Sequence, residues 1–127
     1  MERTPITSDA VPRPAGPYSP GLVVGDLVFL AGQGGSDPET GTLGETIEEQ
    51  TEQTLTTIGK LLEAGGSSFV DIVSCLVHLS DLSLFARYNA VYERFFPEPR
   101  PVRTTVGSDL LHGMLIEITV VATRSTG

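Results

Sequence analysis

The most regular hydrophobic pattern of the chain begins at Thr46, in the segment TIEEQTEQTLTTIGKLLEAGG. Its apolar and threonine positions recur every three or four residues, which predicts an amphipathic helix. Thr46 and Glu49 have the spacing of a capping box at its start, and Gly65-Gly66 is a typical stop. The buried stripe is expected to contain Ile47, Thr51, Leu55, Ile58, Leu61 and Leu62.

Runs of apolar and β-branched residues on both sides of this helix predict strands. In LVVGDLVFLA, Gly25-Asp26 separates two such runs, which indicates a hairpin that leads into a strand at 27–31. The run VDIVSCLVHLS is typical of a strand covered on both faces along part of its length, and two more strands are expected at 101–106 and 114–122. Residues 32–44 are rich in turn formers and predict a loop.

A second helix is expected in SDLSLFARYNAVYERFFPEP, capped by Ser80 or Asp81 and ended by Pro97. Asn89 falls in its apolar stripe, where a side-chain amide needs hydrogen-bond partners. Asn89 therefore either bonds loop backbone or lines a pocket, and the sequence leaves both possibilities open. The other members of the predicted stripe are Leu82, Phe85, Tyr92 and Phe96.

The predicted order ββαβαββ indicates an α+β domain with two helices on one face of a sheet. A chain of 127 residues fits one such domain, which we place at residues 15–127. Residues 1–14 contain three prolines and little periodicity, so they are expected to form an arm that becomes ordered only if something holds it.

The net charge of the chain disfavours negatively charged binding partners. Eight basic and sixteen acidic residues give a net charge of −8, which repels nucleic acids and anionic lipid surfaces. No apolar run has the length of a membrane span, and the N-terminus lacks a signal-peptide core, so a cytoplasmic protein is expected. The single cysteine, Cys75, cannot form an intrachain disulfide and lies in an apolar run, where a buried side chain is expected.

Polar residues in the last two predicted strands are candidates for a functional site. Alternation places Ile116, Ile118 and Val120 on one face of the last strand and Glu117 on the other, while Arg103 and Thr105 share a face in the strand before it. If the two faces coincide, the helix-free side carries Arg103 and Glu117 among apolar neighbours, as in an oligomer interface.

Two interpretations of Arg103 and Glu117 remain open at this point. They form a structural salt bridge, or they await a charged ligand, because an unmatched buried ion is costly. The pairing of the strands is also open, since the loop at 107–113 is able to cross an intervening strand. A further candidate is Tyr18 in AGPYSPG, whose prolines and glycines exclude a helix or central strand and hold the tyrosine either over the core edge or at a site.

Four segments together resemble the Rid family, also called YjgF-type or L-PSP proteins, and within it the RidA enamine and imine deaminases. They are GPYSPG, AGQ at 31–33, YNAVYERFFPEPRPVRTTV at 88–106 and IEITVVA at 116–122. The pattern P-x-R-T/S-x-V followed by I-E-I is the most specific of them, and the resemblance extends from about residue 15 to residue 124. It implies a chorismate-mutase-like fold assembled as a homotrimer, with a central barrel of helix-free sheet faces and three clefts between subunits.

The resemblance also implies an activity, the hydrolysis of 2-aminoacrylate-like enamines and imines to a 2-keto acid and ammonia, without a metal or other cofactor. This is the chemistry of a 2-iminobutanoate/2-iminopropanoate deaminase, which removes reactive intermediates. Arg103 matches the arginine that grips the substrate carboxylate, Glu117 the glutamate that positions water or transfers a proton, and Tyr18 the tyrosine that closes the cleft. Gly32 and Asn89 match positions that line the site.

Three departures from the family pattern bear on substrate binding. Thr105 replaces a cysteine, Ala31 replaces a serine, and Gly34-Gly35 replaces an apolar residue followed by proline. The first matters least, because that position also offers its backbone carbonyl, whereas the glycine pair could reshape the pocket. His78 is expected to be a satisfied strand histidine and His112 a solvated loop residue.

Other functions are compatible with the same residues. The protein could bind small carboxylates such as 2-keto acids without turning them over, or serve one pathway through a pocket altered at Gly34-Gly35. The endoribonuclease activity in the older family label is disfavoured by the net charge of −8 and the lack of a basic patch with interleaved aromatic residues.

Overall fold

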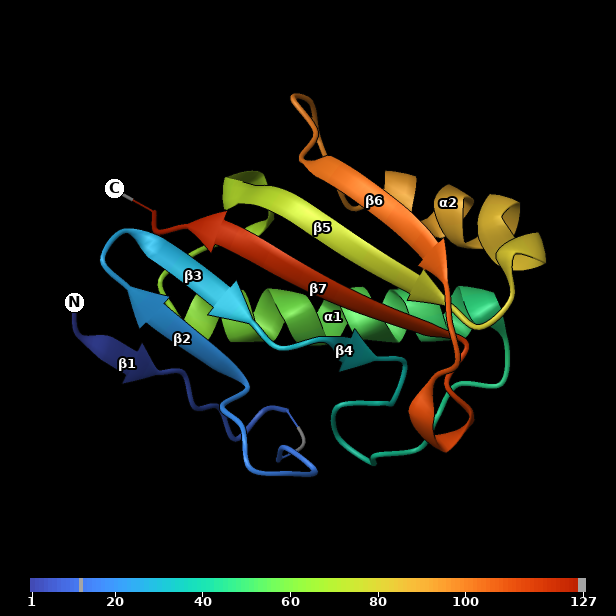
Figure 1. Ribbon diagram of the computed structural model, residues 1–127, viewed down its shortest axis with the longest axis horizontal. Helices are drawn as coiled ribbons and strands as arrows, with labels where there is room; N and C mark the ends of the chain where they lie inside the picture. The colour runs from blue at the N-terminus through green and yellow to red at the C-terminus, as the bar shows by residue number, and fades with distance from the viewer. Residues whose placement is uncertain (12, 126–127) are drawn as a thin grey trace.

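The computed structural model describes residues 1–11 and 13–125. A seven-stranded sheet has the order β1-β2-β3-β7-β5-β6, and the short strand β4 pairs with β7 beyond the end of β3 (Figure 1). The strands are β1 Arg3–Pro5, β2 Gly21–Val24, β3 Leu27–Leu30, β4 Gln33–Gly34, β5 Ile72–Leu79, β6 Val102–Gly107 and β7 Ile116–Thr123. The α-helices are α1 Ile47–Ala64 and α2 Phe85–Glu93, and three short 3-10 turns are η1 Phe69–Asp71, η2 Leu82–Leu84 and η3 Leu111–Gly113.

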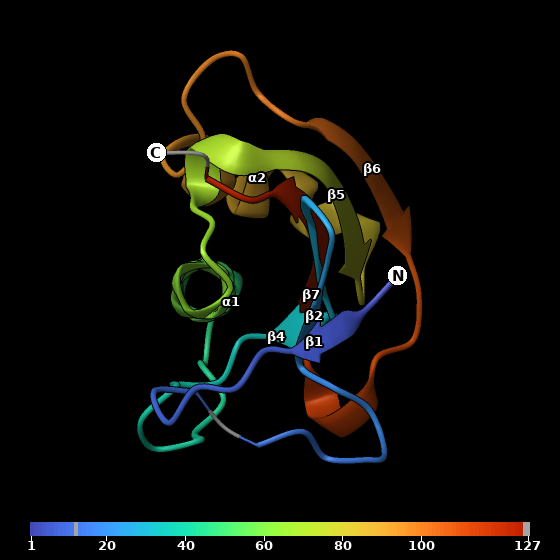
Figure 2. The same cartoon turned by 90° about the vertical axis from the view of Figure 1, so that its left-hand side faces the viewer.

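Both helices cover the same face of the curved sheet, and the described residues place no helix on its other face (Figure 2). The predicted α+β architecture is therefore confirmed. Ile116, Ile118 and Val120 of β7 are buried on the helix side, as their alternation predicted. The predicted stripe of α1 is buried as well. Within the described residues, no helix combines the length and the apolar composition that crossing a bilayer requires.

The strand order settles the pairing that the sequence left open. β5 lies between β7 and β6, pairing antiparallel with β7 and parallel with β6. The connection from β6 to β7 therefore passes over the end of β5, and β6 and β7 do not form a hairpin. Residues 103 and 117 are thus not on neighbouring strands. The parallel pairing follows from the connection through α2, because two parallel strands need a crossover rather than a tight turn.

The ends of α1 agree with the predicted caps. The Thr46 hydroxyl accepts a hydrogen bond from the Glu49 amide at 3.1 Å, and Gly65 follows the last helical residue. The reciprocal bond of the box is displaced by one residue, since the Glu49 carboxylate accepts from the amide of Glu45. The N-terminal turn of α1 is thus fixed next to the segment that contains β4.

The second helix begins later than the pattern indicated. Asp81 caps the amide of Ser83 in η2, and the α-helix begins at Phe85. The expected burial of Leu82 and Phe85 is wrong, because both side chains are exposed, by 56% and 41%. Tyr88 and Val91 are buried instead, together with the predicted Tyr92 and Phe96.

Two short strands lie in segments that the sequence assigned to an arm and a loop. Residues Arg3–Pro5 pair with β2, and the nearby Ile6 and Val11 side chains are buried, so the N-terminal segment is held by the sheet. Gln33–Gly34 forms β4 inside the predicted loop and pairs with Ile118 and Glu117 of β7. β4 thereby brings the AGQ segment next to Glu117.

Candidate active site

Arg103 projects from β6 against one face of α2. Its Nη1 donates a hydrogen bond of 2.7 Å to Oδ1 of Asn89. The guanidinium carbon lies 4.7 Å from the ring centroid of Tyr92, 5.4 Å from that of Tyr88 and 5.6 Å from that of Phe85. We call these three rings the aromatic cradle. The amide of Asn89 thus bonds the predicted site arginine rather than loop backbone.

Arg103 and Glu117 lie on opposite faces of the sheet, so the expectation that they share the helix-free face is wrong. Arg103 pairs with Cys75, whose side chain is buried on the helix side. Glu117 pairs with His78 and alternates with buried neighbours in β7, which places it on the open face. The alternative of a salt bridge within the chain is also wrong, since neither ion pair found in residues 1–11 and 13–125 involves Arg103 or Glu117.

The surroundings of Arg103 form a cavity of about 400 Å³ between α2 and the segment before β6. Its lining comprises Asn89, Tyr92, Glu93, Arg100, Pro101 and Arg103. The hydrogen-bond partner of the guanidinium is a neutral amide, and within the described residues it forms no ion pair, although Glu93 lines the same cavity. Such a site favours an anion.

Thr105 lies two residues further along β6, on the same face as Arg103. Its hydroxyl oxygen lies 2.8 Å from that of Tyr88, within hydrogen-bond distance. Tyr88 is fully buried, and burial raises the pKa of its hydroxyl. At the position where the family pattern has cysteine, Thr105 therefore places a hydroxyl within hydrogen-bond distance of Tyr88, one ring of the aromatic cradle.

A second group of predicted site residues meets at the other end of the sheet. Tyr18, Gly32 and Glu117 line a cavity of about 220 Å³, and Tyr18 is 53% exposed at its surface. A Cβ atom on Gly32 would lie 2.6 Å from Oε1 of Glu117, so the carboxylate occupies space that only glycine leaves free. Ala31 precedes this glycine, and its carbonyl oxygen accepts a hydrogen bond from Nε2 of Gln33 at 3.0 Å.

The two glycines after Gln33 have different roles. Met114 places its sulfur where a Cβ of Gly34 would be, and both residues line the cavity with Glu117. Gly35 is buried against α1, where its Cβ would lie 2.5 Å from Cα of Gln50. The departure at Gly34 therefore affects the shape of the cavity, whereas that at Gly35 is a matter of packing against the helix.

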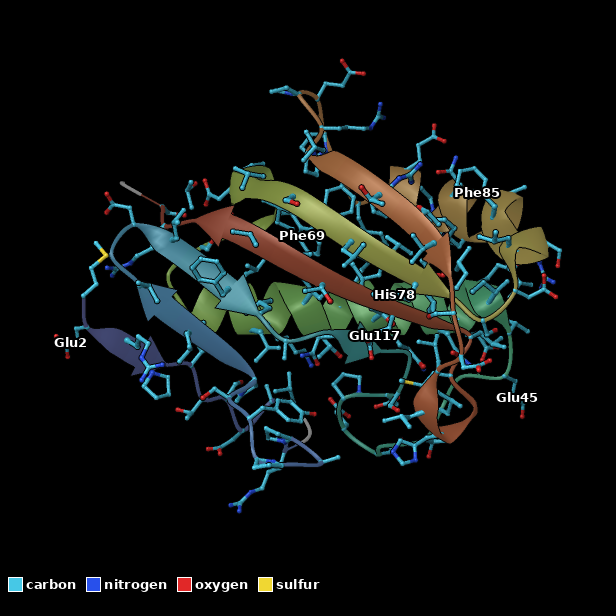
Figure 3. The ribbon with its side chains drawn as sticks, in the orientation of Figure 1. Glu2, Glu45, Phe69, His78, Phe85 and Glu117 are labelled. Carbon is cyan, nitrogen blue, oxygen red and sulfur yellow. The ribbon has the colours of Figure 1, made fainter. Side chains whose placement is uncertain are left out.

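The two histidines lie on the same side as Glu117. Figure 3 shows His78 and Glu117 close together on β5 and β7, while Phe85 lies beyond β6 on α2. We expected the ring nitrogens of His78, a strand histidine, to have hydrogen-bond partners. This is wrong for Nδ1, which is buried and has no hydrogen-bond partner in the described part of the chain. His112 is exposed as expected, and it lines the cavity of Glu117 with a positive φ of 59°.

Cys75 is buried beneath the helices, as predicted, and burial raises the pKa of its thiol. It lies beside Tyr92, whose hydroxyl pKa is likewise raised by burial. The thiol and the phenol are therefore protonated at neutral pH, and neither neutralises the charge of Arg103.

Sequence reasoning missed the residues that surround the predicted ones. The sequence pattern places Phe85 and Tyr92 in an apolar stripe and gives no separate role to Tyr88. The spacing of the three aromatic residues, at intervals of three and four around Asn89, was the available indication of a common face. Met114 gave no such indication, because its place beside Gly34 depends on the pairing of β4 with β7.

Comparison with known proteins identifies the family of the chain. The profile of the family described as Endoribonuclease L-PSP matches residues 8–124. A RutC family protein of Saccharolobus solfataricus is 43% identical over 122 residues, which cover 94% of this chain and 97% of that protein. The 2-iminobutanoate/2-iminopropanoate deaminase of Salmonella typhimurium is 38% identical over 128 residues, covering 98% of this chain and 99% of that protein.

Solved structures lead to the same class. The crystal structure of RidA from the Antarctic bacterium Psychrobacter superposes with a TM-score of 0.92 at 38% identity, covering 95% of this chain and 99% of the other. The fold is thus that of an α+β protein of the YjgF type. The chain belongs to the L-PSP family, also called the Rid family.

Proposed function

We propose that this protein hydrolyses small 2-imino acids and their enamine tautomers to 2-keto acids and ammonia. The observation that carries the proposal is the state of Arg103, a half-buried guanidinium held by a neutral amide and facing a cavity. An arginine has five N–H donors in a planar fork, and Asn89 uses one of them. The remaining donors suit a bidentate bond to the carboxylate of an imino acid.

The acid-base group of the proposed reaction is Glu117. A water molecule attacks the imine carbon, and the Glu117 carboxylate accepts its proton. Glu117 returns that proton to the nitrogen, which completes a neutral carbinolamine. The carboxylate then takes the proton of the carbinolamine hydroxyl and passes it to the nitrogen, so that the C–N bond breaks, ammonia leaves, the oxygen becomes the keto oxygen and Glu117 is again a carboxylate. Orientation and one acid-base group suffice for an already electrophilic imine, since general acid-base help contributes about 10²–10⁴-fold.

Because Arg103 and Glu117 face opposite sides of one sheet, we infer that a complete site joins two subunits. The Arg103 cavity of one protomer would face the Tyr18, Gly32 and Glu117 cavity of the next, in the homotrimer that the family resemblance implies. The open sheet face supports association, because Phe29, Leu76 and Val106 are exposed on it by 40%, 37% and 37%. A water-exposed apolar surface of this kind is typical of an interface.

The test is a coupled assay in which an amino-acid oxidase or dehydratase supplies the imine and 2-keto-acid formation is followed above spontaneous hydrolysis. We expect Arg103→Ala to lower kcat/KM by about 10- to 100-fold, since hydrogen bonds to a charged group are lost. Arg94→Ala is the matched control, because Arg94 is an exposed arginine of the same region that lines neither cavity.

The proposal is wrong if the wild-type protein does not accelerate 2-keto-acid release, or if Arg103→Ala leaves the acceleration intact. Calorimetry with 2-oxobutanoate distinguishes the alternative of a non-catalytic carboxylate binder. Binding that Arg103→Ala abolishes, without any turnover of imines by the wild type, would identify that function instead.

A further inference from the structure

The aromatic cradle is more ordered than a hydrophobic stripe requires. Phe85 and Tyr88 meet edge to face with centroids 5.6 Å apart, and Tyr88 meets Tyr92 in the same way at 5.9 Å. Tyr92 in turn stacks on Phe96 at 4.3 Å. Each ring thus packs against the next one in the series, and the guanidinium of Arg103 lies against the three rings that belong to α2.

The cradle and Asn89 restrain Arg103 in different directions. Tyr92, whose ring centroid is 4.7 Å away, fixes the position of the guanidinium relative to α2, because the negative face of an aromatic ring attracts a cation. The bond from Nη1 to Asn89 fixes its rotation. Among the described residues, no hydrogen bond is formed by Nε or Nη2, so these donors remain available to a ligand.

The rings hold the cation without neutralising it. A carboxylate in their place would compete with the carboxylate of a substrate for the same donors. Aromatic quadrupoles attract the guanidinium more weakly, and the attraction is strongest where water is excluded. Tyr92 meets this condition, since its side chain is 4% exposed.

We propose that Phe85 and Tyr92 are positioning residues, which hold Arg103 through their ring faces for the carboxylate of the substrate. The inference rests on the proposed function, and it assigns to two helix residues a part in substrate affinity that is separate from core packing. A guanidinium held in its binding geometry before the ligand arrives loses less conformational entropy on binding.

Phe85→Leu is the decisive variant, because Phe85 is 41% exposed and its loss should leave the fold intact. We expect about a 2- to 5-fold increase in KM for a 2-imino acid and in the Kd for 2-oxobutanoate, with kcat within about threefold of wild type. Tyr92→Leu should raise both constants by about 10- to 30-fold, since the nearer and better buried ring is lost. Tyr92→Phe is the matched control, because it keeps the ring and removes a buried hydroxyl that has no hydrogen-bond partner in the described part of the chain.

A spectroscopic readout separates positioning from stability. The Nε–H signal of Arg103, identified by its loss in Arg103→Lys, should be shifted by the ring currents and should move toward the free-arginine position in Phe85→Leu. Unchanged KM, Kd and Nε–H position in Phe85→Leu would overturn the inference even if Tyr92→Leu fails to fold. An equal loss of affinity in Tyr92→Phe would overturn it too.

The outcomes also separate this inference from the proposed function. A wild-type protein that binds 2-oxobutanoate without turning over imines refutes the deaminase, while the Kd series still decides the role of the rings. A wild-type protein that neither binds 2-oxobutanoate nor accelerates imine hydrolysis refutes both.

Discussion

Replacing Gly32 by alanine tests the placement of Glu117 with a single methyl group. The added Cβ would lie 2.6 Å from Oε1 of Glu117, about 0.8 Å closer than the 3.4 Å at which ordinary contact begins. The carboxylate is the end of a side chain and lies beside an open cavity, so it is able to move away. Displacement of a reacting group by 1 Å costs about 10²-fold in rate, so we expect kcat/KM to fall by about 10- to 100-fold with an unchanged melting temperature.

Gly35→Ala is the contrasting variant. Its Cβ would meet Cα of Gln50, a backbone atom of α1 that cannot move without shifting the helix. We therefore expect Gly35→Ala to lower the melting temperature and Gly32→Ala to lower only the deamination rate, as measured by calorimetry and the coupled assay. The reasoning is refuted if Gly32→Ala retains full activity, or if its loss of activity merely follows a loss of stability.

Two further predictions concern the supports of α2. The ion pair with Arg87 lowers the pKa of Glu48 from 4.5 to about 2. The ion pair therefore stabilises the folded protein fully above pH 4.5, and this stabilisation is lost as the pH falls through about 2. The difference in melting temperature between wild type and Arg87→Gln should therefore shrink between pH 5 and pH 2, and a constant difference would contradict this. The bond between Tyr88 and Thr105 should contribute about 0.5–1.5 kcal/mol, measured as the coupling energy of Tyr88→Phe and Thr105→Val in a double-mutant cycle with urea unfolding, and additive variants would contradict it.

The sequence was sufficient for the long elements because their patterns are local. The stripe of α1 and the alternation in β7 each extend over enough residues to determine an element and its buried face. The strands β1 and β4, of three and two residues, are too short to show a period. They exist because β2 and β7 offer unpaired backbone groups, which is a property of the sheet and not of the short segments.

The site was harder to predict, because side chains alternate between the two faces of a strand and the sequence does not show which faces of two strands lie on the same side of the sheet. Alternation within β6 correctly grouped Arg103 with Thr105, and alternation within β7 correctly separated Glu117 from Ile116 and Ile118. Which face of β6 matches which face of β7 depends on the strand between them, and no local pattern reveals that β5 lies there. A shift of one position reverses every side chain of a strand, so the error moved Arg103 to the wrong face.

That reversal has a consequence for how an active site is assembled. If the reaction needs Arg103 and Glu117 in one site, a single subunit cannot supply both residues to the same site. Arg103→Ala and Glu117→Gln should then each remove one of the two parts from which neighbouring subunits build a shared active site. Subunits of the two impaired variants, unfolded together in equal amounts and refolded, should regain about a quarter of the wild-type activity, because random association in a ring of three joins an intact arginine to an intact glutamate at one contact in four. Simple mixing of the already assembled variants is the control and should restore nothing until subunits exchange. Activity that stays at the level of the parent variants after refolding would place the arginine and the glutamate of each site in the same chain, and would contradict the shared site.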